Sequence, residues 1–227
     1  AAVGTLPVAA RQSAQTFTVD PTWPQEFPNH WVMGSVTGVF VDSKDHVWIT
    51  SLPETLTEEE LYEEQTPPMG TCCKAAPVVI ELDQNGKVVQ GWGEKAKEDP
   101  ANWPRNPHGI FVDHTDHVWV GTHMHHRVMK FTRQGKLVMT VGEYDKNNGS
   151  NDTKLLGGPS GIWVEDVDRD GRAEIFASCE TLGREKGVAV LGAASAGQLL
   201  VTGPAASLVA ELPDGLALDD LGRYHRL

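Results

Sequence analysis

Residues 38–50 read GVFVDSKDHVWIT and residues 109–121 read GIFVDHTDHVWVG, so two distant stretches of the chain match almost residue for residue. Each consists of a glycine, a short apolar segment ending in Asp42 or Asp113, a polar turn and a second apolar segment. Alternating β-branched residues favour extended strands, and Asp, Ser and Lys are common in the turns between them. Each stretch therefore predicts a β-hairpin.

Two later stretches repeat the hairpin pattern. Residues 161–178 read GIWVEDVDRDGRAEIFAS, with a longer turn, and residues 215–227 read GLALDDLGRYHRL. In the first two units a second pair of strands follows, and each pair is joined by a turn that ends in Gly-Lys. These additional strands are expected at residues 78–82 and 88–92, and at residues 126–131 and 137–141.

Four antiparallel strands in a repeat of roughly 40–50 residues are typical of a β-propeller blade. We therefore predict an all-β fold, a β-propeller of four-stranded antiparallel blades that occupies residues 16–227. Trp48, Trp119 and Trp163 recur at strand positions, and we expect them to pack between blades. The blade repeats begin near residues 38, 109, 161 and 215. A β-sandwich with coincidental internal similarity is the alternative fold.

The repeats amount to about three and a half blades, because the fourth unit ends at Leu227 directly after its second strand. An incomplete ring of blades exposes sheet edges to other chains. We therefore expect the chain to be part of a larger propeller, truncated at the C-terminus. A half-ring that is completed by dimerisation is the alternative.

Composition and charge narrow the classes of protein and partner. The chain has 227 residues, of which 40% are hydrophobic, and its 7 Trp, 23 Gly and 14 Pro argue against a helical bundle or a coiled coil. The formal net charge of −12 disfavours nucleic acid and anionic membranes as partners. No run of apolar residues is long enough to predict a membrane-spanning helix. The expected partner is therefore an unidentified small molecule, peptide or protein, without membrane insertion.

The first fifteen residues differ from the rest of the chain. They read AAVGTLPVAARQSAQ, which is small and apolar, with Arg11 as the single charge. The stretch is typical of the second half of a secretory signal peptide, and a disordered leader is the alternative. A signal peptide would place the protein in the periplasm or outside the cell, where disulfides form.

The first unit carries an insertion between its second and third strands. Residues 54–65 are rich in Glu, and Thr57 with Glu60 forms a capping-box pattern, which predicts a short acidic helix on the surface. Cys72 and Cys73 follow as neighbours, whereas Cys179 stands alone. The adjacent pair can form a vicinal disulfide, one of the two can pair with Cys179, or the thiols can stay unpaired.

An acidic loop in the third unit predicts a metal site. Asp166, Asp168 and Asp170 alternate before a glycine, and Glu174 stands at the ninth position. Carboxylates at alternating loop positions converge on one point, and Ca²⁺ binds six to eight oxygens. A strand follows instead of an EF-hand helix, so the loop resembles the calcium hairpin of FG-GAP and integrin-type blades. This resemblance implies four carboxylate ligands and the Arg172 carbonyl. A solvated acidic turn that binds no ion is the alternative.

A wider resemblance covers residues 16–156, which resemble the NHL-repeat six-bladed β-propeller proteins, particularly exported bacterial ones. It is carried by VDPTWPQEFPNHW, by PPMGTCCKAAPVVIELDQNGKVVQGWG, by NPHGIFVDHTDHVWVGT and by the first hairpin. Beyond Gly157 only the general blade pattern remains. The resemblance implies a six-bladed ring.

His108 lies in NPHGIFVD, and it matches the histidine of the PHG motif in peptidyl-α-hydroxyglycine α-amidating lyases. In that family, one such histidine from each of three blades holds a catalytic zinc, so the resemblance implies His108 as a zinc ligand. The equivalent positions of the other units are Thr37, Ser160 and Asp214. The HMHH run at residues 123–126 offers further imidazoles, which we interpret as exposed polar residues, with metal binding through His123 and His125 as the alternative.

Two functions of different class follow. The first is an exported NHL-type propeller that binds a ligand or a protein and carries a structural Ca²⁺. The second is a metal-dependent lyase or hydrolase of the amidating-lyase or gluconolactonase-like kind, with its site at the propeller channel. The sequence contains no Walker loop, GxSxG elbow or Gly-rich dinucleotide motif, so no catalytic residue is assigned.

Overall fold

The computed structural model describes residues 17–94, 96–148, 155–166, 174–180, 186–192, 199–204, 216–218 and 224–226. At Glu174 and beyond Ser178 it describes the backbone and not the side chains. The predicted leader at residues 1–15 lies outside the described residues, as do Asp168, Asp170 and Arg172 of the predicted calcium loop.

Strands account for most of the regular structure in the described ranges. They are β1 (Trp31–Val32), β2 (Ser35–Val41), β3 (Val47–Leu52), β4 (Lys74–Ala75), β5 (Val79–Leu82), β6 (Val88–Trp92), β7 (Pro107–Val112), β8 (His117–Thr122), β9 (Arg127–Thr132), β10 (Leu137–Gly142), β11 (Gly158–Glu165), β12 (Glu174–Glu180), β13 (Lys186–Gly192), β14 (Leu199–Pro204), β15 (Leu216–Leu218) and β16 (Tyr224–Arg226). The short 3₁₀ turns are η1 (Pro28–His30), η2 (Pro53–Thr55), η3 (Glu58–Glu60) and η4 (His123–His125). The prediction of an all-β fold is confirmed.

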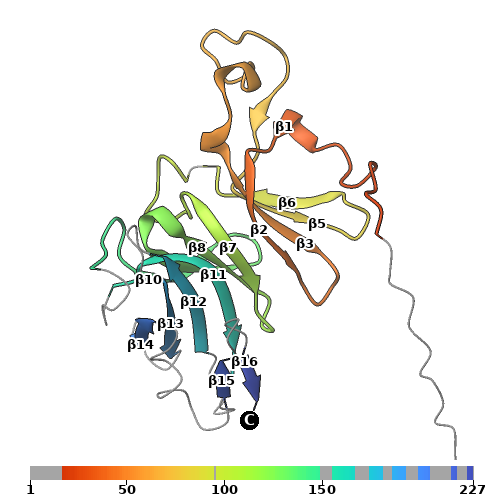
Figure 1. Ribbon diagram of the computed structural model, residues 1–227. Helices are drawn as coiled ribbons and strands as arrows, with labels where there is room; N and C mark the ends of the chain where they lie inside the picture. Colours follow the sequence, from red (N-terminus) through yellow and green to blue (C-terminus); the bar gives the residue numbers. More distant parts are fainter. Residues whose placement is uncertain are drawn as a thin grey trace, which may run out of the picture.

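Three four-stranded antiparallel sheets form the blades (Figure 1). Blade 1 has the strand order β2-β3-β5-β6, blade 2 the order β7-β8-β9-β10, and blade 3 the order β11-β12-β13-β14. A further antiparallel pair, β15–β16, follows blade 3 in the chain. The repeated hairpins also share their register, since Val39 pairs with Ile49 and the equivalent Ile110 pairs with Val120. The predicted partial propeller of four-stranded blades is confirmed.

The first strand of each blade lies next to the first strand of its neighbour. β7 contacts β2 on one side and β11 on the other, and Figure 1 shows the three strands side by side. Side-chain hydroxyls connect the first two blades, because Thr37 Oγ1 donates to the Pro107 carbonyl at 2.8 Å and Thr50 Oγ1 donates to the His108 carbonyl at 3.1 Å. These inner strands therefore position the residues near the propeller axis.

Apolar side chains fill the spaces between the blades. The buried cluster between blades 1 and 2 consists of Trp48, Val78, Val79, Trp92, Ala96, Ile110, Val112, Val118, Val120, Met129 and Phe131. The cluster between blades 2 and 3 consists of Phe111, Trp119, Val128, Val141, Leu156, Val164, Ile175 and Ala177. Trp48 and Trp119 thus pack between blades, whereas Trp163 is more than half exposed.

The aspartate that directly follows β7 holds the hairpin turn of blade 2. The Asp113 carboxylate accepts the backbone N–H groups of Thr115 and His117 at 2.9 and 3.0 Å. The indole N–H of Trp119 donates to the same carboxylate at 2.8 Å. Burial raises the pKa of Asp113, but hydrogen bonds from Thr115 and Trp119 outweigh it and lower the pKa to about 2. The conserved turn geometry of the repeat therefore depends on an ionised aspartate.

The insertion in blade 1 differs from the predicted acidic helix. Thr57 and Glu60 form the expected capping box, with the Thr57 N–H donating to the Glu60 carboxylate at 2.9 Å, but the segment forms 3₁₀ turns and not an α-helix. The backbone leaves helical geometry directly after the turn, at Leu61, whose φ and ψ are −124° and 41°. Cys72 and Cys73 are joined by a disulfide near the end of the insertion. No helix in the described ranges is long and apolar enough to cross a membrane.

Candidate functional site

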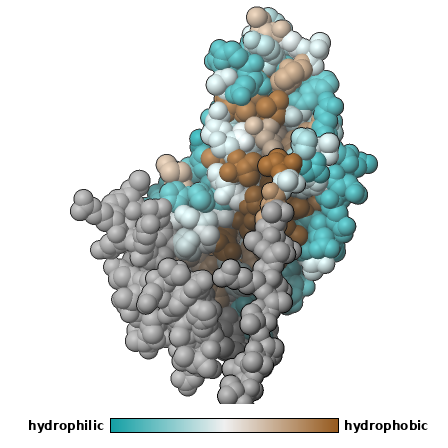
Figure 2. Space-filling model, turned by 45° about the vertical axis from the view of Figure 1, so that its right-hand side comes forward, coloured by the Kyte–Doolittle hydropathy of each residue, from teal (hydrophilic) through white to brown (hydrophobic). Residues whose placement is uncertain are grey.

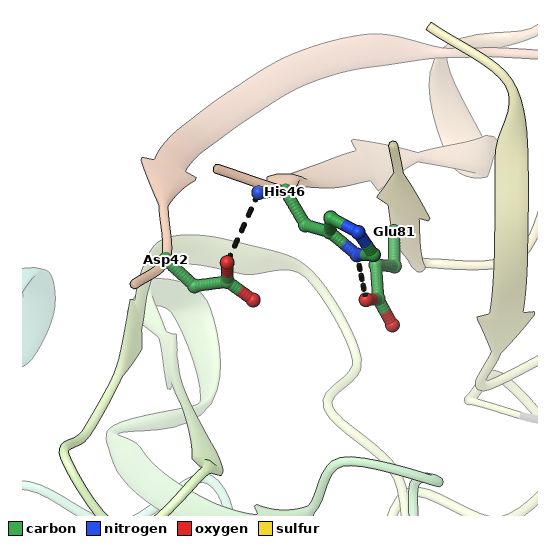
Figure 3. Close-up of side chains that lie close together, drawn as sticks. All are labelled: Asp42, His46 and Glu81. Atoms are coloured by element: carbon green, nitrogen blue, oxygen red, sulfur yellow. Dashed lines mark hydrogen bonds and ion pairs between the residues drawn. The ribbon is translucent and has the colours of Figure 1, made fainter. Parts of the chain in front are cut away.

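Within the described ranges, one group of three metal-ligating side chains comes together at the turn end of blade 1. Asp42, His46 and Glu81 present ligand atoms that all lie within 4.8 Å of one another (Figure 3). Asp42 directly follows β2, His46 precedes β3, and Glu81 projects from β5. His46 connects the two acids, since its Nδ1 lies 2.6 Å from Glu81 Oε1 and its backbone N–H donates to Asp42 at 3.0 Å.

Arg133, from the β9–β10 turn of blade 2, lies against this group. Its guanidinium donates to Asp42 Oδ2 at 2.7 Å and also pairs with Glu81. Burial lowers the pKa of Arg133, but hydrogen bonds to Glu81 and Asp42 outweigh it and raise the pKa above its ordinary value. The guanidinium thus supplies the positive charge that two buried carboxylates require. This group connects blade 1 to blade 2.

Asp42 carries the same hydrogen bonds as its counterpart in blade 2. Burial raises its pKa, but hydrogen bonds from the Trp48 indole, from the backbone N–H groups of His46 and Lys44 and from Arg133 lower the pKa to about 2. The sequence analysis did not identify this group, because Glu81 and Arg133 lie far apart in the sequence. The indication that the sequence offered was the aspartate that recurs in the hairpins as Asp42 and Asp113.

His108 lies at the opposite end of blade 2, in β7, where Pro107 pairs with Thr122 of β8. Its Nδ1 lies 3.2 Å from the Ser160 carbonyl oxygen of blade 3. Because a carbonyl oxygen only accepts, Nδ1 carries a hydrogen, and in the neutral ring Nε2 is then the nitrogen with the lone pair. The His108 side chain therefore has a fixed orientation next to the inner strand of the neighbouring blade.

His123 lies close to His108. The centroids of the two rings are 5.6 Å apart, and the rings are tilted by 44°. His123 begins η4, the turn between β8 and β9, so this second imidazole comes from a loop and not from the inner strand of another blade. Two neighbouring imidazoles suit a transition metal ion or an acidic group of a ligand.

The equivalents of His108 in the other blades do not complete a three-histidine site. Thr37 donates its hydroxyl hydrogen to the Pro107 carbonyl, and Ser160 contributes its backbone carbonyl to His108. Asp214 lies outside the described residues. In the part of the chain that the structure describes, no third His, Cys, Asp or Glu joins His108 and His123 in a metal-binding group. Three-histidine zinc binding is therefore not assembled by these residues.

The rest of the HMHH run differs from the exposed loop that we expected. His125 is buried, with Nδ1 2.5 Å from Asp145 Oδ1 and Nε2 2.9 Å from Asn106 Oδ1. Its ring stacks on Tyr144, with centroids 4.6 Å apart. Because both ring nitrogens contact protein oxygens, His125 joins the loops around blade 2 instead of facing a ligand. Burial lowers the pKa of His126.

The predicted calcium loop joins β11 to β12. Asp166 follows β11 directly, and Glu174 begins β12, where it pairs with Glu165. The loop therefore connects the first two strands of blade 3, the same place as the Asp113 turn in blade 2. Asp168, Asp170 and Arg172 lie outside the described residues, as does the side chain of Glu174.

Comparisons with known proteins give likenesses to solved structures alone, since no family model and no curated protein match the chain. A protein of unknown function from Bacteroides caccae is 13% identical, covering 81% of this chain and 49% of that chain, with a TM-score of 0.42. A gluconolactonase from Xanthomonas campestris is 13% identical over 82% and 51%, with a TM-score of 0.42. Virginiamycin B lyase from Staphylococcus aureus is 12% identical over 83% and 61%, with a TM-score of 0.38. This chain spans about half to three-fifths of their lengths, and the blades themselves define it as a partial β-propeller.

Proposed function

We propose that this chain is an exported NHL-type propeller that binds a ligand at the end of its channel, through His108 and His123. The observation that carries the proposal is the orientation of His108, whose Nδ1–H donates to the Ser160 carbonyl, so that Nε2 is the lone-pair nitrogen of the neutral ring. The neighbouring ring of His123 provides a second imidazole. Two half-buried imidazoles lie beside the inner strands, and such polar groups at fixed places can orient a bound ligand.

The ligand is a small molecule, or a peptide or protein segment, that offers a group for imidazole. Neutral imidazole nitrogens bind transition metal ions and accept hydrogen bonds, and protonated ones bind acidic oxygens. The net charge of −12 disfavours polyanions such as nucleic acid. Export is supported by the Cys72–Cys73 disulfide, because disulfides persist in oxidising compartments.

Zn²⁺ is the probe that tests the imidazole pair. In titration calorimetry, we expect His108→Ala and His123→Ala each to weaken Zn²⁺ binding by at least about tenfold, because each removes one of two ligands. His114→Ala is the matched control, since His114 is exposed in the turn at the other end of the same blade. Equal affinity in all four proteins would contradict the proposed site.

A second candidate is the metal-dependent lyase or hydrolase. One observation favours it: a histidine that donates Nδ1–H to a backbone carbonyl has the orientation commonly found in metal ligands. A bound metal ion would polarise a substrate oxygen, and His108 and His123 would hold it. Hydrolysis of a sugar lactone, lost in His108→Ala, is the activity to measure. Zn²⁺ binding without turnover would leave the binding function and remove this candidate.

We also propose that the loop between β11 and β12 binds a structural Ca²⁺ through Asp166, Asp168, Asp170 and Glu174. Four carboxylates on one short loop repel one another without a cation, and their spacing suits Ca²⁺. The ion would hold the first hairpin of blade 3, where blades 1 and 2 each use one aspartate.

Removal of Ca²⁺ is therefore expected to destabilise the chain. Chelation with EGTA should lower the melting temperature by about 5 °C, because an ion that binds only the folded state adds its binding free energy to stability. Asp168→Ala should melt at the lower temperature with or without Ca²⁺. Asp83→Ala, in the β5–β6 turn, should keep the Ca²⁺ response. A wild-type melting temperature that is independent of Ca²⁺ would contradict the site.

A further inference from the structure

Arg127 is a buried arginine that forms no ion pair with an acidic side chain in the described ranges. It begins β9 and is 3% exposed. Its Nη2 donates to the Pro100 carbonyl at 2.7 Å, and its guanidinium lies over the Tyr144 ring, 4.9 Å from the centroid. Its Nε is buried and has no hydrogen-bond partner among the described residues. Because arginine keeps its charge, a guanidinium in this place requires an acceptor oxygen that this part of the chain does not supply.

Arg105 brings a second guanidinium to the same tyrosine. It precedes β7, and its Nη1 donates to the Tyr144 hydroxyl oxygen at 3.3 Å. Its Nε is also buried, again without a hydrogen-bond partner in the described part of the chain. The side chain as a whole is 32% exposed. Tyr144 therefore contacts Arg127 with its ring face and Arg105 with its hydroxyl, and the Arg105 side chain is accessible from solvent.

The acidic side chains near these arginines do not provide the missing acceptors. Glu54 Oε1 lies 3.8 Å from Arg105 Nε, which is beyond hydrogen-bond distance. Asp145 Oδ1 lies 2.5 Å from His125 Nδ1, and it forms no ion pair with either arginine of this group. Arg133, at the other end of blade 2, contacts three carboxylates. The chain thus neutralises Arg133 with its own acids, whereas Arg105 and Arg127 keep unpartnered N–H donors.

The acidic insertion of blade 1 borders this group. Glu54 belongs to η2, and η3 carries three further glutamates. Figure 2 shows hydrophilic side chains on both sides of the insertion, at the top of the molecule. Because like charges repel, this acidic segment disfavours a general attraction of anions to the surface. Binding of an anion by the two arginines therefore depends on directed hydrogen bonds.

The two arginines lie at the same end of blade 2 as the imidazole pair. Pro107 of β7 pairs with Thr122 of β8, and Thr122 pairs with Arg127 of β9. His108 and His123 directly follow the first two of these residues in the chain. Since neighbouring strands are about 4.8 Å apart, the backbone at Arg127 lies roughly 10 Å from the backbone at Pro107. This separation is comparable to the length of a small organic molecule.

We propose that Arg105 and Arg127 form a binding site for the carboxylate of a small organic acid. A carboxylate offers two acceptor oxygens in one plane, and guanidinium N–H groups donate to them in charge-assisted hydrogen bonds. The two unpartnered Nε–H groups require such acceptors, and Tyr144 holds both guanidiniums in place. That the same acid also contacts the imidazoles rests on the proposed function. Carboxylate binding itself requires neither histidine.

Acetate is the probe for this site. In titration calorimetry at constant ionic strength, the wild type should bind acetate. Arg105→Gln and Arg127→Gln should each weaken binding by at least about tenfold, because each removes charge-assisted hydrogen bonds. Lys136→Gln is the matched control, since it removes one positive charge from the exposed turn between β9 and β10, at the other end of blade 2. It should bind acetate like the wild type.

Circular dichroism checks that each variant is folded, and the partly exposed Arg105 decides the test if Arg127→Gln unfolds. A wild type that binds no acetate overturns the carboxylate site, and so does an Arg105→Gln protein that binds acetate with unchanged affinity. Sulfate that binds more tightly than acetate would overturn the carboxylate as the ligand group. A wild type that binds acetate without Zn²⁺ affinity would contradict the imidazole pair alone, whereas Zn²⁺ binding without acetate binding overturns this site alone.

Discussion

Arg133→Ala is expected to lower the free energy of unfolding by about 3–5 kcal/mol, the cost of removing one partner from a buried ion pair. The guanidinium is the positive charge that contacts both Asp42 and Glu81, whose side chains are almost completely buried. It also lies over the Trp48 ring, 5.0 Å from the centroid. Without Arg133, two carboxylates remain next to each other in a site that excludes water, and packing between blades 1 and 2 is weakened.

Urea denaturation measures this effect. Lys44→Ala is the matched control, because the Lys44–Asp116 pair has a short distance of 2.7 Å but both side chains are exposed, and such pairs contribute about 1 kcal/mol or less. The double variant Arg133→Ala with Glu81→Gln should be more stable than Arg133→Ala alone, since one buried charge is gone. An Arg133→Ala protein as stable as Lys44→Ala would show that the ion pairs do not connect the blades.

The same variant also tests whether Asp42, His46 and Glu81 bind a metal ion or have their charge balanced by Arg133 alone. If the guanidinium takes the place of a cation, Zn²⁺ should raise the melting temperature of Arg133→Ala more than that of the wild type. If these three residues bind a metal ion beside Arg133, Zn²⁺ should stabilise the wild type as well. The comparison protein that keeps Arg133 must carry His108→Ala, so that the site at the channel end does not contribute to its response.

The blades could be predicted from the sequence because the residue pattern that specifies each hairpin lies within a short stretch of the chain. Gly38, the apolar alternation after it and the turn at Asp42 all lie within one hairpin, and the match to residues 109–121 repeats each of them. Strand pairing then follows from the alternation, since a shift by one residue would place Val39 and Val41 on the other face of the sheet. The acidic insertion shows the limit of this reasoning, because its capping box formed without an α-helix.

The sites were harder to predict because they depend on contacts between blades. Arg133 lies in a turn, where a basic residue is expected to be exposed to solvent. The packing of blade 2 on blade 1 brings it to Glu81. His125 also lies in a loop, where a histidine is expected to be exposed, yet contacts with Asp145 and Asn106 bury it. His108 was identified through its motif, whereas the approach of His123 depends on the conformation of η4.

Asp113→Ala is expected to cost about 3 kcal/mol, because it leaves the buried indole N–H of Trp119 without its acceptor and releases the β7–β8 turn. In the Asp113→Ala background, Trp119→Phe should cost less than it does in the wild type, since the unpaired N–H is removed. Trp163→Phe is the matched control, because the Trp163 indole donates to exposed Glu165. Costs that simply add would contradict a direct dependence of Trp119 on Asp113.

The same aspartates set the acid stability of the chain. Asp42 and Asp113 have a pKa of about 2 in the folded protein, against an ordinary value of 3.8. Between pH 4 and pH 2 the unfolded chain therefore binds more protons than the folded one, and each aspartate loses its contribution of about 2 kcal/mol as the pH falls through this window. Asp113→Ala removes one of these two groups, so the decline of its stability from pH 4 to pH 2 should be shallower than that of the wild type. A decline of equal steepness in both proteins would mean that other carboxylates control acid unfolding, and that the ionised aspartate of the repeated hairpin does not stabilise the blade.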